Sequence, residues 1–182
     1  MKVRKIFFHS LHSTNAYAKD HASTFSHDEL TCIIADKQTA GYGQFGRKWI
    51  SPKGVNLYIT FFFCLPANTA RIEELAVFMG KVLKTVLEKQ GVSATLKWPN
   101  DLIIGSKKLA GVLCETIYDP SHIAVILGFG LNVNMGEADL MKVNQAATSL
   151  KLETGQTWDR DKLLDDILKQ FLTDLPLSYK IF

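Results

Sequence analysis

Residues 95–117 read TLKWPNDLIIGSKKLAGVLCETI, in which three mostly apolar runs are separated by two short polar breaks. The runs 95–98, 101–104 and 107–117 predict three strands, because apolar and β-branched residues bounded by turn residues are typical of strands. Gly105 and Ser106 suit a two-residue hairpin turn, since glycine adopts the positive φ that such turns require. Consecutive hairpins favour an antiparallel or mixed sheet over a doubly wound parallel one.

The rest of the chain adds strands and helices on either side of these hairpins. Further strands are expected at 3–8, 31–36, 56–65 and 123–134. A first helix is expected to begin at Ser13-Thr14-Asn15 and to run to about His21, because these side chains can cap a helix N-terminus. Apolar residues at helical spacing predict two longer helices, at 71–90 and at about 158–175.

Length and composition indicate a single globular domain over residues 1–182, with 47% hydrophobic and 21% charged residues. We expect an α+β fold, with a mixed and mostly antiparallel sheet backed by helices. The net charge of +3 is too small to predict a nucleic-acid partner. No apolar run is long enough for a membrane span or a signal-peptide core, so we expect a cytoplasmic protein without a membrane partner.

The cysteines and histidines show no local metal-binding pattern. Cys32, Cys64 and Cys114 lie in apolar runs without a CxxC pair, and we expect buried free thiols in a reducing compartment. The five histidines are His9, His12, His21, His27 and His122. None of their spacings is typical of metal ligands, so we expect no metal site that is built by the protein alone.

The loop 38–55 has the composition of a ligand-binding loop, with four glycines and one proline. Spaced glycines let a backbone approach phosphate oxygens, Arg47 and Lys48 add positive charge, and Trp49 offers a flat face to a purine. The alternative is a mobile surface loop with a buried tryptophan, and the loop alone does not favour either reading. A dinucleotide fold is not expected, because these glycines do not open a helix after a strand.

The segment 97–111 contains charged residues suited to holding two anions that react with each other. Lys108 lies just past the turn, where a compact cation can neutralise a carboxylate and a phosphate that react together. Asp101 lies before the turn and could bind magnesium or receive a proton from an attacking amine. Lys97 and Asn100 could hold either partner. The alternative is a solvent-facing hairpin in which Asp101 pairs with a lysine across the strands.

Two other segments have both a structural and a functional interpretation. Asn132, within the glycine-containing segment 128–134, could read a sugar hydroxyl or an amide, or the segment could be a strand with bulges. Ser13, Thr14 and Asn15 are most simply a helix cap, and could instead bind a small polar ligand.

Taken in this order, these segments resemble the catalytic domain of biotin protein ligases over nearly the whole chain. The motifs that carry the resemblance are KWPNDL at 97–102, KKLAGVL at 107–113 with Glu115, RKW at 47–49 leading to SPxGxNLY at 51–58, and GxGxNVN at 128–134. The resemblance implies a fold like the catalytic core of class II aminoacyl-tRNA synthetases.

The resemblance also implies an ATP-dependent biotin–[biotin carboxyl-carrier protein] ligase. In its first half-reaction, the biotin carboxylate attacks the α-phosphate of ATP and gives biotinyl-5′-AMP and pyrophosphate. In the second, a lysine of a biotin carboxyl carrier protein, an acetyl-CoA carboxylase subunit, attacks the mixed anhydride and releases AMP. ATP, Mg²⁺ and biotin are therefore the expected ligands, with Mg²⁺ arriving with ATP and lying near Asp101.

Site residues follow from the resemblance position by position. The expected catalytic residues are Lys108, Asp101 and Arg47. The expected biotin contacts are Ser13, Thr14, Asn15, Gln38, Gly41, Tyr42, Gly43, Gln44, Lys108 and Gly111. The expected ATP and adenylate contacts are Arg47, Trp49, Lys97, Asn100, Lys108 and Asn132.

One position departs from the family pattern. Gln44 stands where the family often has an arginine that faces the adenylate phosphate. Loss of a charge-assisted hydrogen bond there would cost about 1.5–3 kcal/mol. We therefore expect weaker retention of biotinyl-AMP, unless Lys48 or Lys107 supplies the charge.

The alternatives are a lipoate or octanoyl transferase-like enzyme and a non-catalytic biotin- or nucleotide-binding module. The first should lack the run Lys97-Trp98-Pro99-Asn100-Asp101, and the joint presence of Lys108 and Asp101 argues against the second. We expect no N-terminal helix-turn-helix domain, no C-terminal SH3-like domain and no repressor role. Edge strands of the sheet could pair into a homodimer.

Overall fold

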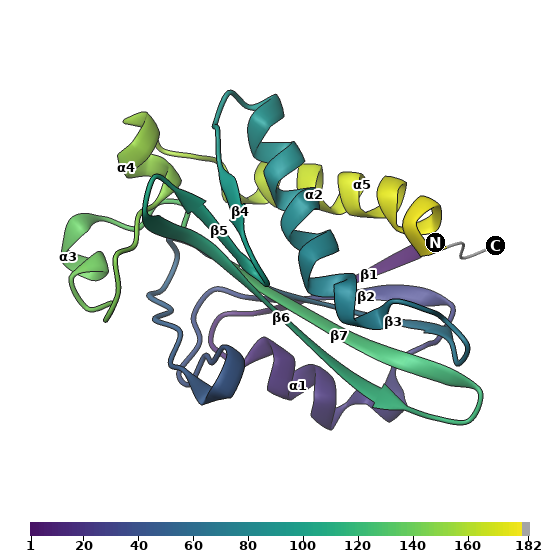
Figure 1. Ribbon diagram of the computed structural model, residues 1–182. Helices are drawn as coiled ribbons and strands as arrows, with labels where there is room; N and C mark the ends of the chain where they lie inside the picture. Colours follow the sequence, from purple (N-terminus) through teal and green to yellow (C-terminus); the bar gives the residue numbers. More distant parts are fainter. Residues whose placement is uncertain (180–182) are drawn as a thin grey trace.

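Seven strands form one mixed sheet in the order β1-β2-β3-β7-β6-β5-β4, in a computed structural model that describes residues 1–179 (Figure 1). The strands are β1 (Lys2–Phe8), β2 (Glu29–Ala35), β3 (Leu57–Pro66), β4 (Thr95–Lys97), β5 (Asp101–Ile104), β6 (Lys107–Tyr118) and β7 (His122–Leu131). Only β1 and β2 pair in parallel, and all other neighbours are antiparallel. The predicted mixed, mostly antiparallel sheet is confirmed.

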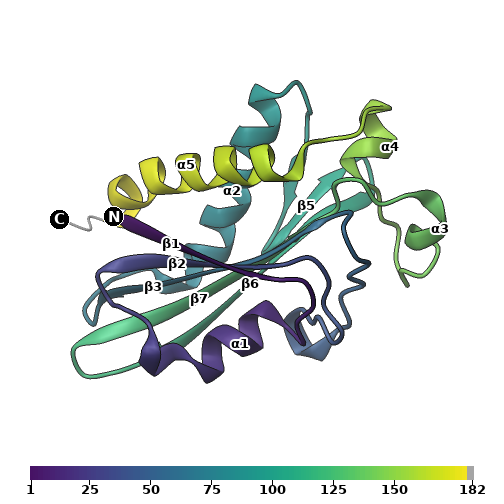
Figure 2. The same ribbon diagram turned by 180° about the vertical axis from the view of Figure 1, so that it is seen from behind.

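Helices cover both faces of this sheet. They are α1 (Thr14–Asp20), α2 (Leu75–Lys89), α3 (Glu137–Leu140), α4 (Leu150–Thr154) and α5 (Arg160–Tyr179), with short 3-10 turns η1 (Ala22–Thr24), η2 (Gln44–Gly46) and η3 (Ile72–Glu74). Helices α2 and α5 lie on one face, and α1 lies on the other, as the two opposite views show (Figures 1 and 2). The α1 face also carries the loop between β2 and β3.

Alternate residues of the central strands point to opposite faces of the sheet. On β3, Phe61 and Phe63 point towards α2 and α5, while Phe62 and Cys64 point towards α1. Phe171 of α5 packs against Phe61, with ring centroids 4.8 Å apart. Each fully buried ring contributes about 1.5–3 kcal/mol through the hydrophobic effect. Because β3 is buried on both sides, its sequence is a continuous apolar run.

The boundaries differ from the predicted ones at a few places. The predicted helix 71–90 begins with the turn η3, and α2 proper starts at Leu75. Strand β7 ends at Leu131, because the backbone of the next residues bonds to loops, as in Asn134 N donating to Val55 O. Helix α5 continues past Pro176, beyond its predicted end. Helices α3 and α4 were not predicted, since four or five residues are too few for a periodic pattern.

The predicted environment of the cysteines is confirmed only in part. All three are free, but only Cys32 is buried, whereas Cys64 and Cys114 are half-buried. Within residues 1–179, no helix has both the length and the apolar character needed to cross a membrane.

Candidate active site

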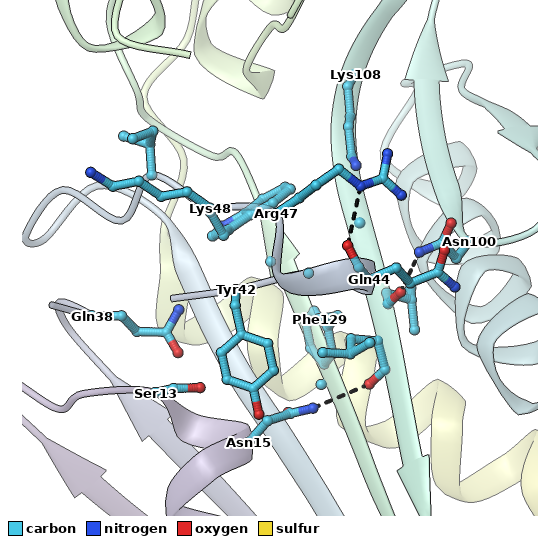
Figure 3. A pocket seen from close by; sticks show the side chains of 18 of the residues that line it. Ser13, Asn15, Gln38, Tyr42, Gln44, Arg47, Lys48, Asn100, Lys108 and Phe129 are labelled. Carbon is cyan, nitrogen blue, oxygen red and sulfur yellow. Dashed lines mark hydrogen bonds between the residues drawn. The ribbon is translucent and has the colours of Figure 1, made fainter. Parts of the chain in front are cut away.

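A cavity of about 380 Å³ opens on the α1 face of the sheet, within the usual size range of ligand pockets (Figure 3). The start of α1, the loop 42–50, and strands β6 and β7 form its walls. The predicted site residues that line it are Ser13, Thr14, Asn15, Gln38, Tyr42, Gly43, Gln44, Arg47, Trp49, Asn100, Lys108 and Gly111. Folding therefore gathers most of the predicted site around one space.

One end of the cavity is neutral and rich in hydrogen-bonding groups. Ser13 caps α1 by accepting from Ala16 N, and Ser13, Thr14 and Asn15 are all buried. The backbone N–H and the hydroxyl of Thr14 both donate to Gln38 Oε1, at 2.9 and 3.1 Å. Gln38 Nε2 donates to Ser51 Oγ at 3.2 Å. These bonds hold the amide of Gln38 in one orientation beside the helix N-terminus.

Glu115 of β6 anchors this polar end from outside the cavity. Its Oε2 accepts from Asn15 Nδ2 at 3.0 Å and from the Tyr42 hydroxyl at 3.1 Å, and its Oε1 lies 2.5 Å from Lys19 Nζ. Burial pushes the pKa of Glu115 up, but the bonds from Lys19, Asn15 and Tyr42 outweigh it and hold the pKa below its usual value. Burial and then the Glu115 charge raise the pKa of Tyr42 to about 12.

Glu115 is part of a sequence motif, but sequence reasoning assigned it no role. Its signal was a single acidic side chain within an apolar strand, which is costly unless the carboxylate has partners.

A β-bulge aims Lys108 at the other end of the cavity. Leu102 pairs with Ala110, but Ile103 pairs with Lys108, so Leu109 is an extra residue on β6. Simple alternation would have put Lys108 on the face of Ala110, which packs under α2 and α5. The bulge shifts the alternation by one residue, so Lys108 shares the cavity face instead.

Lys108 faces an acid and an aromatic ring. Its Nζ lies 2.7 Å from Asp101 Oδ1 and 5.3 Å from the centroid of the Trp49 ring. The ion pair is close but not aligned as a hydrogen bond, and Asp101 Oδ1 has no hydrogen-bond partner among the described residues. Pairing of Asp101 with a lysine across the strands was the alternative interpretation of this hairpin. That pairing does occur, but it lies at the cavity.

Trp49 lies on a floor made of glycine. Gly111 and Gly130 face each other on β6 and β7, and a Cβ on Gly130 would collide with the indole ring. The Trp49 Nε1–H is buried and has no partner among the described residues. Gly128, two residues earlier on β7, leaves room in the same way for the Asn15 amide.

The glycine loop closes on itself above this floor. Trp49 N donates to Gly41 O at 2.8 Å, and Gly43 N donates to Arg47 O at 2.7 Å. A Cβ on Gly41 would lie 2.6 Å from Gln38 Nε2, so only glycine fits there. Arg47 and Lys48 line the cavity and are both exposed, so they lie where it opens to solvent (Figure 3). Arg47 Nε donates to Gln44 O at 3.1 Å.

Four predicted site residues lie outside the lining. Gly41 is buried within the loop, and Asp101 lies beside the cavity through its pair with Lys108. Lys97 is exposed on β4, opposite Asp101. Asn132 is buried, and its amide accepts from Asn56 Nδ2 and donates to Thr148 O. Both ends of this amide join segments of the fold, and the predicted contact of Asn132 with the nucleotide stays a prediction.

The segment 142–145 lines the cavity and was not predicted. It is held against β6 because Lys108 N donates to Ala146 O and Thr148 N donates to Lys108 O, both at 2.9 Å. No periodicity or motif marks this segment in the sequence. Lys107, in contrast, points away from the cavity, with Nζ 3.8 Å from Glu153 Oε1.

Comparisons with known proteins found similar sequences over most of the chain. The profile of the biotin/lipoate A/B protein ligase family matches residues 7–132. The chain is 35% identical over 167 residues to the bifunctional ligase/repressor BirA of Escherichia coli, covering 91% of this chain and 51% of that protein. It is 32% identical over 166 residues to a biotin–[acetyl-CoA-carboxylase] ligase of Paracoccus denitrificans, covering 87% and 68%. The chain thus spans about half the length of the E. coli relative.

A solved structure has the same fold. The biotin protein ligase of Aquifex aeolicus, in complex with biotin and ATP, superposes with a TM-score of 0.78 and 31% sequence identity. The match covers 97% of this chain and 72% of that one.

Proposed function

Because this chain belongs to the biotin/lipoate A/B protein ligase family, we propose that it is an ATP-dependent biotin protein ligase of the cytoplasm. It activates biotin as biotinyl-5′-AMP and transfers the biotinyl group to a lysine of a biotin carboxyl carrier protein. The observation that carries the proposal is one cavity with a neutral hydrogen-bonding end and a cationic end. Biotin has an uncharged ureido ring and a carboxylate, so it matches both ends.

In the first half-reaction, a carboxylate oxygen of biotin forms a bond to the α-phosphorus of ATP. The bond from that phosphorus to the bridging oxygen breaks, and pyrophosphate leaves. The two reacting groups are anions, so a cation must offset their repulsion. Lys108 would supply this cation, because the bulge turns its ammonium into the cavity. Arg47 and Lys48 add positive charge at the entrance.

The site must also accommodate Mg²⁺, because ATP reacts as its magnesium complex. The Asp101 carboxylate fits this ion, because magnesium prefers carboxylate oxygens and Asp101 Oδ1 lacks an aligned hydrogen-bond donor within residues 1–179. Asp101 would hold one side of the ion, which would lower the negative charge on the phosphates.

In the second half-reaction, the amine of the carrier lysine forms a bond to the acyl carbon. The acyl–oxygen bond breaks, AMP leaves and the amine loses one proton. Asp101 lies beside Lys108 and would be the group that receives that proton. The mixed anhydride is labile to water, so the loop 41–49 has a purpose in covering it.

The proposal is tested by biotin-dependent release of pyrophosphate from ATP, followed by transfer of labelled biotin to a carrier domain. We expect both activities, and we expect lipoate to replace biotin poorly. Silence in both steps would refute the ligase proposal. Activity with lipoate but not with biotin would favour the transferase-like alternative.

Strand β1 offers a site for a homodimer. Within residues 1–179 it pairs only with β2, so its outer edge presents backbone groups to a second copy. Light scattering across a concentration series tests this, and a monomer at every concentration would exclude it.

A further inference from the structure

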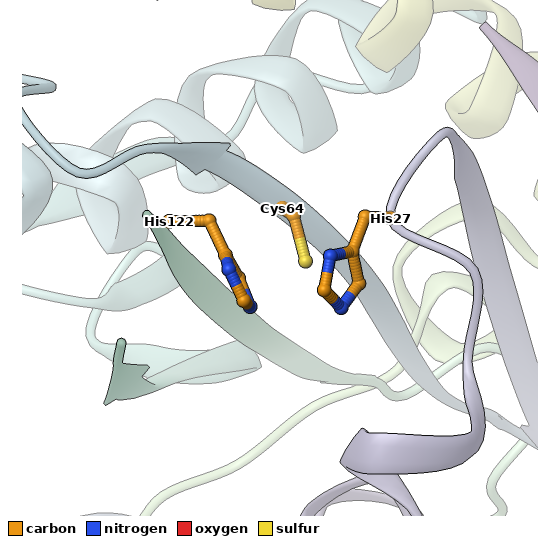
Figure 4. Close-up of side chains that lie close together, drawn as sticks. All are labelled: His27, Cys64 and His122. Carbon is orange, nitrogen blue, oxygen red and sulfur yellow. The ribbon is translucent and has the colours of Figure 1, made fainter. Parts of the chain in front are cut away.

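The side chains of His27, Cys64 and His122 converge at the end of β3 and β7 that lies away from the cavity (Figure 4). One ligand atom from each lies within 4.8 Å of the others, and the two imidazole centroids are 4.0 Å apart. Figure 4 shows the Cys64 sulfur pointing between the two rings. Among residues 1–179, this is the only such group of three potential metal ligands.

The fold brings these residues together without help from a ligand. Pro66 pairs with His122 and Cys64 pairs with Ala124, so Cys64 and His122 are diagonal neighbours on one face of the sheet. His27 comes from the loop between η1 and β2, two residues after the buried Phe25. The Phe25 ring packs against Phe62 with centroids 4.9 Å apart, which holds the loop near the strands.

We propose that His27, Cys64 and His122 bind a thiophilic transition-metal ion, with zinc as the native occupant. Two imidazoles and one thiolate form a donor set that suits zinc, and zinc takes four ligands in a tetrahedral arrangement. The fourth ligand is a water molecule, because His27 is exposed and leaves the site open to solvent.

Groups around the cluster favour a bound cation. His122 Nδ1 lies 3.0 Å from Ser121 Oγ and 3.5 Å from Asp119 Oδ1, which leaves Nε2 for the metal. Histidine ligands commonly use their second nitrogen in this way. Zinc binds cysteine as the thiolate, so metal binding would form a metal–sulfur bond and release the thiol proton to solvent.

This site is separate from the adenylation cavity. His122 and Gly128, which lines the cavity, are six residues apart on β7, and at about 3.3 Å per residue this is roughly 20 Å. The ion would tie the loop that precedes β2 to the end of the β3–β7 pair. Its effect is on stability rather than on either half-reaction, so the inference does not depend on the proposed function.

The test uses untagged protein that has been stripped of metal and titrated with Co²⁺, a spectroscopic substitute for zinc. We expect one equivalent to bind with a sulfur-to-cobalt charge-transfer band, which Zn²⁺ then displaces. Cys64→Ser should remove the band, and His27→Ala or His122→Ala should weaken binding about 10-fold or more. Cys114→Ser and His9→Ala are matched controls, since both lie outside the cluster, and they should leave the band unchanged.

A thermal measurement gives a second readout. Zn²⁺ at about 100 times its dissociation constant should raise the Tm by roughly 5–10 °C. The exposed His27 makes His27→Ala the variant with the smallest effect on folding, and at the same Zn²⁺ concentration it should lose about half of this rise or more. Absence of the charge-transfer band in wild-type protein, or an unchanged band in folded Cys64→Ser protein, would overturn the proposal.

Discussion

Lys108 Nζ lies 2.7 Å from Asp101 Oδ1, at the point where a β-bulge turns Lys108 into the cavity. Both side chains are about one-fifth exposed, so the pair is screened less than one at the surface. In the proposed reaction, the carboxylate of biotin and the phosphate of ATP would compete with Asp101 for the ammonium. The ion pair thus keeps Lys108 in place while the site is empty.

Lys108→Ala should slow biotin-dependent pyrophosphate release by about 10²–10³-fold, because the charge that offsets two reacting anions is lost. Lys107→Ala is the matched control, since Lys107 is adjacent but points towards Glu153. It should stay within about twofold of wild type. Full activity in Lys108→Ala would refute the assigned role.

Asp101→Asn should lower the rate of the first half-reaction by about tenfold or more and should shift the Mg²⁺ requirement to higher concentration. The amide keeps the size of the carboxylate but not its charge. The measurement is pyrophosphate release against magnesium concentration at fixed ATP. An unchanged magnesium dependence would exclude Asp101 as a ligand and leave only its role beside the amine.

Gln44→Arg should slow the release of biotinyl-AMP. Gln44 lines the cavity, and Lys107 does not, so Lys107 cannot supply the missing charge. A charge-assisted bond of about 1.5–3 kcal/mol corresponds to roughly 10–150-fold slower dissociation. Dissociation of labelled intermediate from preloaded enzyme measures this, and equal rates for wild type and Gln44→Arg would contradict the prediction.

Glycine substitutions on β7 should separate the two ends of the cavity. Gly130→Ala displaces Trp49 and should raise the KM for ATP, while Gly128→Ala displaces Asn15 and should raise the KM for biotin. Gly136→Ala is the control, because a Cβ there meets nothing within 4 Å. Equal effects of the two β7 variants on both KM values would contradict this division.

Glu115→Gln should destabilise the protein near neutral pH by about 1.5–3 kcal/mol, since the carboxylate accepts hydrogen bonds from Asn15 and Tyr42. The folded pKa of Glu115 is lowered, so its contribution is present above the unfolded pKa, near 4.5. That contribution is lost as the pH falls through the folded pKa. Tm measured from pH 7 to pH 3 should therefore fall more steeply for wild type than for Glu115→Gln.

Local patterns in the sequence were enough for the elements and for much of the site. Alternation, the Gly105–Ser106 turn and the Ser13 cap each depend on residues close in the chain, so they predict hairpins and helix starts. The family resemblance then placed Gln38, Trp49 and Lys108 in one site, and the structure brings all three to one cavity.

Long-range pairing decided the rest. The extra residue Leu109 on β6 aims Lys108 at the cavity, and no local pattern shows which strand carries a bulge. The amide of Asn132 bonds to the buried Asn56 and Thr148, a contact that no local pattern predicts. Strand register alone brought Cys64 beside His122, and a loop then added His27. Such contacts join residues far apart in the chain, so their geometry exists only once the sheet has formed.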